Sequence, residues 1–299
     1  MGPPGRTVSP VLLDGIPCYA PELANVNDGF PAERFARLYD AELTNFWYRS
    51  RARIIKRLVL AKLSGAAEFL EIGCGTGSLL EFLSHGTQFR LTGAEAYLDG
   101  LKRAKARLPD SEFVQLDAGR LPFQDRFDGV GLFDVLEHLD DDEGALRGVL
   151  RALKPGGHVF ATAPQHPSLW SANDDVAFHR RRYRRGELAA KFRRAGFQVE
   201  VENSFVTTLF PLLAISRLLN RRPPAGDPYE AVLRELELAP PLNAALGALM
   251  RVDEALIAAG ARLPFGGSVV VVGRRPPAPW RAGGGRSLPQ PCIGSKWVA

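Results

Sequence analysis

Apolar and polar residues follow the periods of strands and helices through most of residues 66–206. Short apolar runs, such as EFLEI at 68–72 and FDGVGLF at 127–133, are typical of buried parallel strands. Stretches with apolar residues at every third or fourth position separate these runs and predict helices. Because crossovers between parallel strands are right-handed, the pattern predicts an α/β fold with a doubly wound, mostly parallel sheet.

Two further strands complete the predicted sheet. Residues 197–206 begin with strict alternation, and residues 267–273 form the apolar run GSVVVVG. Five strands are predicted between residues 66 and 163, so these two bring the expected number to seven. The chain between them, residues 207–264, is then a helical insertion before the last strand.

The regions outside the sheet are predicted from composition and periodicity. Residues 1–28 are rich in proline and glycine and predict a flexible arm, and residues 277–299 predict a disordered tail. Residues 29–65 show helical spacing and predict an N-terminal helical cap, whose stretch 42–51 could face a ligand. Residues 66–276 form the predicted main domain.

The insertion at 207–264 allows more than one interpretation. Its pattern predicts helices at 209–219, 229–238 and 242–261, interrupted by proline pairs. The segment 209–222 is apolar and ends in arginines, which is compatible with peripheral contact to a membrane. A substrate lid, or packing on the sheet edge or on a second subunit, explains the same pattern.

A glycine-rich loop follows the first predicted strand. Gly73, Gly75 and Gly77 stand where the backbone turns sharply and passes close under a ligand, so that a Cβ would collide. A dinucleotide fingerprint requires Gly-x-Gly-x-x-Gly, but Ser78 occupies the sixth position. Glu71 places a carboxylate beside the loop, which favours an ammonium or sulfonium group over a pyrophosphate.

Acidic residues end the next two predicted strands. Glu95 closes residues 90–95 and stands where a carboxylate commonly binds two ribose hydroxyls. Asp117 closes residues 112–117, and with Ala118 it could contact an adenine. These residues predict a cationic adenosine-containing ligand at the carboxyl ends of the strands.

Five segments occur in the order and spacing of a known family: EIGCGTG, Glu95, LDAGRLPF at 116–123, FDGVGLFDVLEHL at 127–139, and LKPGGHVFATAP at 153–164. Over residues 66–202 the chain resembles class I S-adenosylmethionine-dependent methyltransferases. The resemblance implies a Rossmann-like fold whose last two strands pair antiparallel, with S-adenosylmethionine as the cofactor. It assigns cofactor contacts to Glu71, Gly73, Cys74, Gly75, Gly77, Glu95, Ala96, Asp117, Ala118 and Phe133.

Methyl transfer requires alignment of the acceptor and, for a hydroxyl acceptor, a base. We expect a small-molecule acceptor from biosynthetic metabolism that is aromatic, glycosylated or lipid-linked, with the methyl group transferred to an oxygen. The catalytic candidates are His138, after the fourth strand, and His179 and Tyr183, after the fifth. Structural roles for the three side chains remain open.

A divalent metal ion is a further alternative at the fourth strand. Some relatives, including quinone-biosynthesis O-methyltransferases and small-RNA methyltransferases, bind an ion through a Glu-x-x-Glu-His segment. This chain has Asp134 before Glu137 and His138. Aspartate is shorter and no further ligand is evident in the sequence, so no metal site is predicted.

Composition narrows the partners. The formal net charge is +5 and no nucleic-acid-binding module is recognisable, so we expect no nucleic-acid substrate. Three separated cysteines, no apolar segment after Met1 and no long apolar run predict a cytoplasmic protein without a transmembrane helix. A nicotinamide-dependent oxidoreductase and a non-catalytic binding module are the alternative functions, and the oligomeric state is not predicted.

Overall fold

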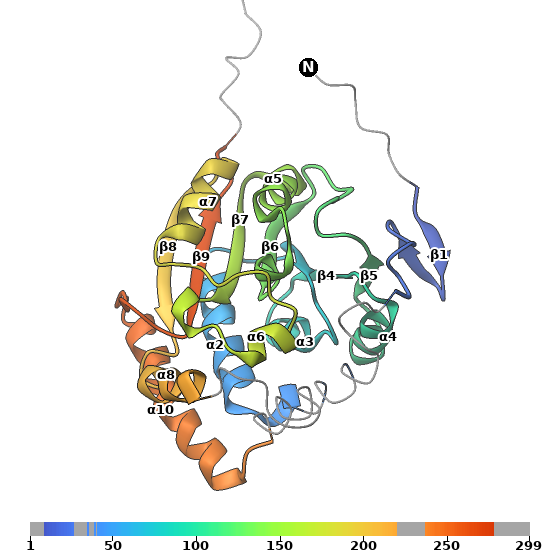
Figure 1. Cartoon of the computed structure of the whole chain (residues 1–299). Coiled ribbons are helices and arrows are strands. Elements are labelled where there is room, and N and C mark those ends of the chain that lie inside the picture. The colour runs from blue at the N-terminus through green and yellow to red at the C-terminus, as the bar shows by residue number, and fades with distance from the viewer. Residues whose placement is uncertain (1–8, 27–34, 36–38, 40, 220–236, 278–299) are drawn as a thin grey trace, which may run out of the picture.

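The computed structural model describes residues 9–26, 35, 39, 41–219 and 237–277. Its centre is a nine-stranded sheet with the order β1-β2-β5-β4-β3-β6-β7-β9-β8 (Figure 1). The strands are β1 Val11–Leu13, β2 Ile16–Cys18, β3 Glu68–Ile72, β4 Arg90–Glu95, β5 Glu112–Gln115, β6 Phe127–Phe133, β7 Leu153–Pro164, β8 Gln198–Phe205 and β9 Ser268–Arg274.

Helices cover both faces of the sheet. The α-helices are α2 Phe46–Leu60, α3 Ser78–Ser84, α4 Leu98–Arg107, α5 Asp142–Ala152, α6 Ala172–Val176, α7 Glu187–Ala195, α8 Phe210–Leu219 and α10 Pro240–Ala258, with short 3-10 helices η1 Leu136–His138 and η2 Pro167–Leu169. Apolar residues of α5 and α7 share one core with Leu70 and Ile72, whereas α2, α3 and α4 pack around Phe69. Since successive strand residues point to opposite faces, these cores lie on the two sides of the sheet.

The seven strands predicted from the sequence are present as β3 to β9. Strands β5, β4, β3, β6 and β7 pair in parallel, and β9 pairs antiparallel with both β7 and β8. The doubly wound, mostly parallel α/β fold is therefore confirmed. The parallel strands end at one edge, where ligands bind in folds of this kind.

The predicted flexible arm over residues 1–28 is wrong for its central part. Strands β1 and β2 form a hairpin that extends the sheet beyond β5. Buried Gln115 fixes the chain after β2, because its side-chain amide bonds both backbone groups of Ala20 and the carbonyl of Ala96. Three-residue strands among prolines and glycines give too little periodicity to be predicted; residues 1–8 lie outside the described part.

Two helices of the insertion between β8 and β9 are described, α8 and α10. The predicted helix at 229–238 falls almost entirely outside the described residues, and the predicted tail beyond residue 277 lies outside them as well. Helix α10 begins at Pro240, whereas the sequence pattern placed the start at 242. Proline suits this first position because the N–H it lacks would have no partner within the helix.

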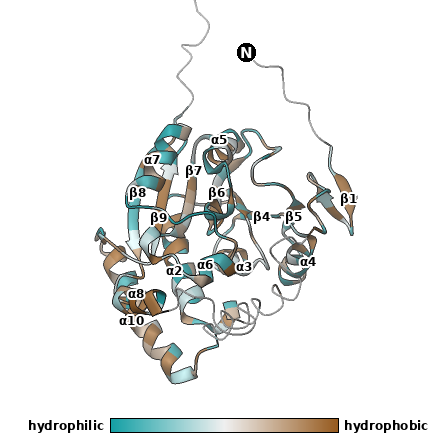
Figure 2. Ribbon diagram, in the orientation of Figure 1, coloured by the Kyte–Doolittle hydropathy of each residue, from teal (hydrophilic) through white to brown (hydrophobic). Residues whose placement is uncertain are grey.

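Helix α10 braces α2. Glu254 accepts hydrogen bonds from Ser50 Oγ at 2.6 Å and Arg53 Nε at 2.7 Å, and the Asn243 amide bonds the backbone of residues 44 and 46. Hydrophobic residues predominate in α8 and α10 (Figure 2), and several leucines of both helices are exposed. None of the helices described is long and apolar enough to cross a membrane.

Asp253 joins α10 to the start of α8, and we expect its removal to destabilise the protein. Its fully buried carboxylate accepts the backbone N–H groups of Thr207 at 2.6 Å and Thr208 at 3.0 Å. Asp253→Ala leaves both donors unpaired and should lower the free energy of unfolding by about 2–4 kcal/mol. Urea denaturation measures this loss. The exposed Arg251→Ala on the same helix serves as the control, and equal midpoints for the two variants would contradict the assignment.

Candidate functional site

A cavity of about 590 Å³ opens at the carboxyl edge of the parallel strands. Its wall follows the ends of β5, β4, β3 and β6 in that order, and α2 and residues 177–180 complete it. Nine of the ten predicted cofactor residues line the cavity: Glu71, Gly73, Cys74, Gly75, Glu95, Ala96, Asp117, Ala118 and Phe133. Only Gly77 lies outside the wall.

The glycine loop leaves β3 with left-handed backbone at all three glycines, whose φ values are 72°, 53° and 78°. A Cβ on Gly73 would lie 2.5 Å from Val135 Cγ2. Gly77 begins α3, where a Cβ would lie 3.0 Å from the Cβ of Ala104. Gly77 therefore shapes the loop and its packing, although it does not face the cavity.

Glu71 presents a buried carboxylate to the cavity. Its Oε2 has no hydrogen-bond partner among the described residues. Burial raises the pKa of Glu71 to about 8, against the effect of Arg51, while Glu42 and Glu95 raise it further. A cationic ligand would relieve this arrangement, because an opposite charge favours the ionised carboxylate.

Glu95 and Asp117 are held by backbone groups. Glu95 accepts the N–H of Ala96 at 2.7 Å and of Gly75 at 3.1 Å, and burial raises its pKa. Asp117 accepts the N–H of Gly119 at 2.8 Å and pairs with Arg120 at 3.0 Å. Both carboxylates are thus fixed in orientation and retain capacity to accept further hydrogen bonds from a ligand.

Helix α2 forms one wall of the cavity. The sequence predicts only that the stretch 42–51 could face a ligand, without a role for any single residue. Trp47, Tyr48 and Arg51 of α2 line the cavity together with Glu42, which precedes the helix. Arg51 Nε lies 2.7 Å from Asp134 Oδ2, and its Nη2 donates to the carbonyl of Phe133 at 2.9 Å. Arg51 thus links α2 to the end of β6. The sequence contains many arginines, and no local pattern distinguishes Arg51 as the one with this role.

His138 and His179 lie together at the β6 end of the cavity. The ring centroids are 4.9 Å apart, and His138 lines the wall whereas His179 stands behind it. Burial, and then the neighbouring His179, lower the pKa of His138 to about 4, so its imidazole is neutral at pH 7. His179 Nδ1 bonds Asp174 Oδ1 at 2.9 Å.

Tyr183 does not reach the cavity, and its predicted contact with an acceptor finds no support. Its side chain is fully buried in the core, and its hydroxyl donates to Asp142 Oδ2 at 2.8 Å. The neighbouring arginines are mostly structural: Arg182 pairs with Asp174 at 2.7 Å and Arg181 with Asp142 at 3.4 Å, while Arg180 lines the cavity. Trp170, considered as a wall, bonds Asp175 instead.

A doubly wound sheet, a glycine loop beside a buried acid, and further acids ending the next two strands define a class I S-adenosylmethionine-dependent methyltransferase. The family model described as a methyltransferase domain matches residues 39–202, and the chain belongs to that family. The cofactor is S-adenosylmethionine. The residues fit it, because the partnerless Glu71 oxygen suits its positive charge and Glu95 suits its ribose.

Curated relatives support this membership. A probable S-adenosylmethionine-dependent methyltransferase of Mycolicibacterium smegmatis is 28% identical over 159 residues, which cover 52% of this chain and 61% of that protein. A ubiquinone/menaquinone biosynthesis C-methyltransferase of Pseudomonas fluorescens is 37% identical over 141 residues, 42% of this chain and 55% of that protein. The chain thus matches less than two thirds of the length of these relatives.

Solved structures share the fold. A phosphoethanolamine N-methyltransferase of Haemonchus contortus, in complex with S-adenosyl-L-methionine, aligns with a TM-score of 0.57 at 15% identity, over 83% of this chain and 58% of that one. A methyltransferase of Thermotoga maritima aligns with a TM-score of 0.51 at 20% identity, over 81% and 97%. At these identities the comparison shows the common fold alone.

We expect cofactor binding to release the proton of Glu71. Its raised pKa of about 8 means that the empty site is largely protonated at pH 6.5, whereas a bound cation favours the carboxylate. Affinity should therefore rise with pH and level off above about 8. Calorimetry in buffers of different ionisation enthalpy measures the proton released.

Glu71→Gln should abolish this buffer dependence and weaken binding. Glu68→Gln, at the opposite end of the same strand, should retain both properties of the wild type. Proton release that persists undiminished in Glu71→Gln would assign the linkage to Glu42 or Glu95, whose pKa values burial also raises.

Proposed function

We propose that the protein transfers the methyl group of S-adenosylmethionine to a hydroxyl oxygen of a small aromatic acceptor. The proposal rests on one observation: the cavity runs along the sheet edge, and its two ends carry different side chains. Asp117, Glu95 and Glu71 stand at the ends of β5, β4 and β3, where they suit adenine, ribose and the charged end of the cofactor. The acceptor then occupies the β6 end.

Aromatic side chains surround the proposed acceptor end. Trp47, Tyr48, Phe133 and Phe178 line the cavity together with His138. Flat apolar walls favour an aromatic ring, and the polar His138 favours a hydroxyl on that ring. Arg180 stands at the same end, largely exposed, where it suits an acidic substituent.

When bound, S-adenosylmethionine supplies a methyl group on a positively charged sulfur. The residues of this chain then act mainly by alignment, since bringing two reactants together in the correct geometry removes much of the barrier. Glu71 and the glycine loop orient the charged end, Arg51 and Asp134 close the cavity beneath α2, and neutral His138 presents an electron pair toward the acceptor hydroxyl. Buried walls exclude water that would compete as an acceptor.

Transfer to carbon is the second candidate. Two relatives carry quinone-related names, the Pseudomonas C-methyltransferase and a demethylmenaquinone methyltransferase of Lactococcus lactis that is 30% identical over 167 residues. Both names contain a quinone, which supports an oxygenated ring as the acceptor. In the hydroxylated form of such a ring, an adjacent carbon competes with the oxygen for the methyl group.

A lipid surface is the partner that we propose for α8 and α10. Helix α8 buries none of its residues and contains no acidic side chain, and exposed apolar residues continue along α10. These residues are Leu212, Ile215, Leu218, Leu219, Leu242, Leu249, Val252 and Leu256. An apolar face of this kind suits the interface of a bilayer, from which a lipid-linked acceptor could be taken.

The enzymatic proposal predicts a labelled product. Incubation with methyl-labelled S-adenosylmethionine and hydroxylated aromatic compounds, such as a hydroquinone, should give a methyl ether that mass spectrometry and NMR identify. Glu95→Ala should weaken cofactor binding about 10- to 100-fold, since it removes hydrogen bonds to a charged group. Glu112→Gln, exposed on the neighbouring β5, is the control. A C-methylated product would favour the second candidate, and no product with bound cofactor would contradict both.

The membrane proposal predicts co-sedimentation with liposomes of phosphatidylcholine and phosphatidylglycerol. Ile215→Glu with Leu219→Glu places two charges on one face of α8, where the side chains are 56% and 78% exposed, and should release the protein into the supernatant. Leu12→Glu, 70% exposed on β1, tests whether any new surface charge has this effect. Wild-type protein that stays in the supernatant would end the proposal.

A further inference from the structure

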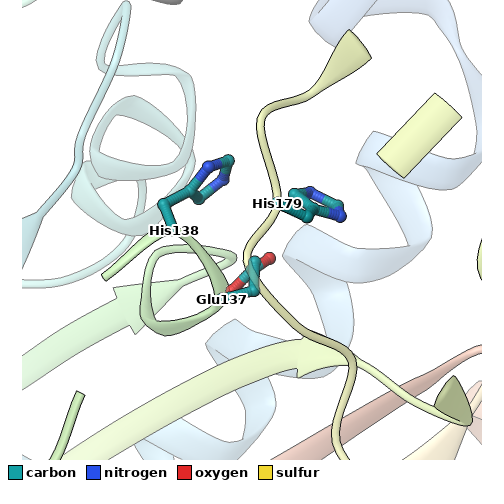
Figure 3. A group of neighbouring side chains, drawn as sticks. All are labelled: Glu137, His138 and His179. Atoms are coloured by element: carbon teal, nitrogen blue, oxygen red, sulfur yellow. The ribbon is translucent and has the colours of Figure 1, made fainter. Parts of the chain in front are cut away.

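Three side chains from two separate parts of the chain converge behind the β6 end of the cavity. Glu137 and His138 belong to η1, and His179 belongs to the loop after α6 (Figure 3). One potential ligand atom from each lies within 4.8 Å of the others. The group therefore combines one carboxylate oxygen with two imidazole nitrogens around a common space.

Glu137 lacks partners for a buried acid. Its side chain is fully buried, and neither carboxylate oxygen has a hydrogen bond to another residue within the described part of the chain. The two arginines whose charges act on it already pair with other acids, Arg51 with Asp134 and Arg182 with Asp174. Because an unsatisfied polar group in a protein interior costs free energy, this carboxylate calls for a further ligand.

His179 is oriented for ligation. Its Nδ1 bonds Asp174 Oδ1 at 2.9 Å, which leaves Nε2 available. Asp174 is fixed in turn by the N–H of Ser171 at 2.9 Å and by Arg182 at 2.7 Å. A carboxylate on the second nitrogen is the usual support of a metal-binding histidine, because it sets the tautomer and the direction of the ring.

The loop that carries His179 is clamped against η1. The N–H of Arg180 donates to the carbonyl of Glu137 at 2.7 Å, and His138 forms a hydrogen bond with the backbone of Phe178. Backbone contacts on both sides of His179 thus hold its ring close to Glu137. The cluster is built by the fold and does not depend on the chance approach of surface side chains.

We propose that Glu137, His138 and His179 bind a divalent transition-metal ion. One carboxylate and two imidazoles suit Zn²⁺, Mn²⁺ or Fe²⁺ better than Mg²⁺, which prefers oxygen ligands. Metal–ligand bonds of about 2.0–2.2 Å place tetrahedral ligand atoms roughly 3.4 Å apart, so the side chains need to close by no more than roughly 1.5 Å per pair.

The remaining coordination positions could serve the reaction. Three protein ligands leave at least one position open, and His138 places the ion at the cavity wall. An acceptor hydroxyl bound there would lose its proton to solvent more readily, because a cation stabilises the oxyanion. With its electron pair on the ion, His138 would then act as a ligand and not as the base. The role of the ion toward the acceptor rests on the proposed function, whereas binding of the ion does not.

Cobalt is the probe for the test, because Co²⁺ bound by imidazole and carboxylate ligands absorbs visible light. Metal-free wild-type protein, titrated without cofactor or acceptor, should bind one equivalent and gain this absorption. Glu137→Gln and His179→Gln should each weaken binding at least tenfold, whereas the exposed His85→Gln should bind as the wild type does. S-adenosylmethionine calorimetry on every variant checks that the fold is retained.

The outcomes separate the ion from the reaction. No stoichiometric uptake of Co²⁺, Zn²⁺ or Mn²⁺ by the wild type, or unchanged uptake by folded Glu137→Gln and His179→Gln, would overturn the site. Methyl transfer that a chelator abolishes and added Zn²⁺ or Mn²⁺ restores would support the role of the ion toward the acceptor. Transfer that is insensitive to the chelator would overturn that role, and metal uptake without any methyl transfer would contradict the proposed function instead.

Discussion

The cavity is organised by buried acidic side chains. Glu42, Glu71, Glu95, Asp134 and Glu137 converge on the carboxyl edge of the sheet, and burial raises the pKa values of Glu42, Glu71, Glu95 and Glu137. Each acid that remains ionised there needs a positive partner or hydrogen-bond donors. Arg51 meets this need for Asp134, and backbone N–H groups meet part of it for Glu95. Glu71 and Glu137 have carboxylate oxygens without such partners in the described residues, so these oxygens are available to ligands.

The same constraint explains why elements outside the parallel sheet matter. Arg51 can balance Asp134 only while α2 lies against β6, and α10 holds α2 there through Glu254 and Asn243. At the opposite end, Gln115 bonds the chain after β2 to the end of β4. The hairpin, which precedes the parallel strands in sequence, and the insertion, which lies between β8 and β9, thus fix the two ends of the cavity.

Sequence reasoning predicted what local patterns and glycine spacing control. The seven strands and the loop at Gly73 to Gly77 follow from short segments whose backbone geometry demands particular residues. Most of the residues predicted to contact the cofactor line the cavity. The assignment of Tyr183 as a catalytic candidate was wrong, because its side chain is buried in the core. The local sequence, a tyrosine among arginines after the fifth strand, does not distinguish a residue that faces a cavity from one that faces the core. The roles of Arg51 and Gln115 depend on contacts between distant segments, which no local pattern records.

Asp134 shows how one residue type can redirect a site. Its side chain is one methylene shorter than glutamate, and it pairs with Arg51 at 2.7 Å and accepts from Thr162 at 3.1 Å. It therefore stabilises α2 and is not available to Glu137 and His138. The sequence contained no obvious ligand to replace Asp134, but the fold brings His179 close to Glu137 and His138. The proposed ion has three protein ligands and, with Asp134 withdrawn, keeps a coordination position for an acceptor oxygen, which Asp134 as a fourth ligand would have occupied.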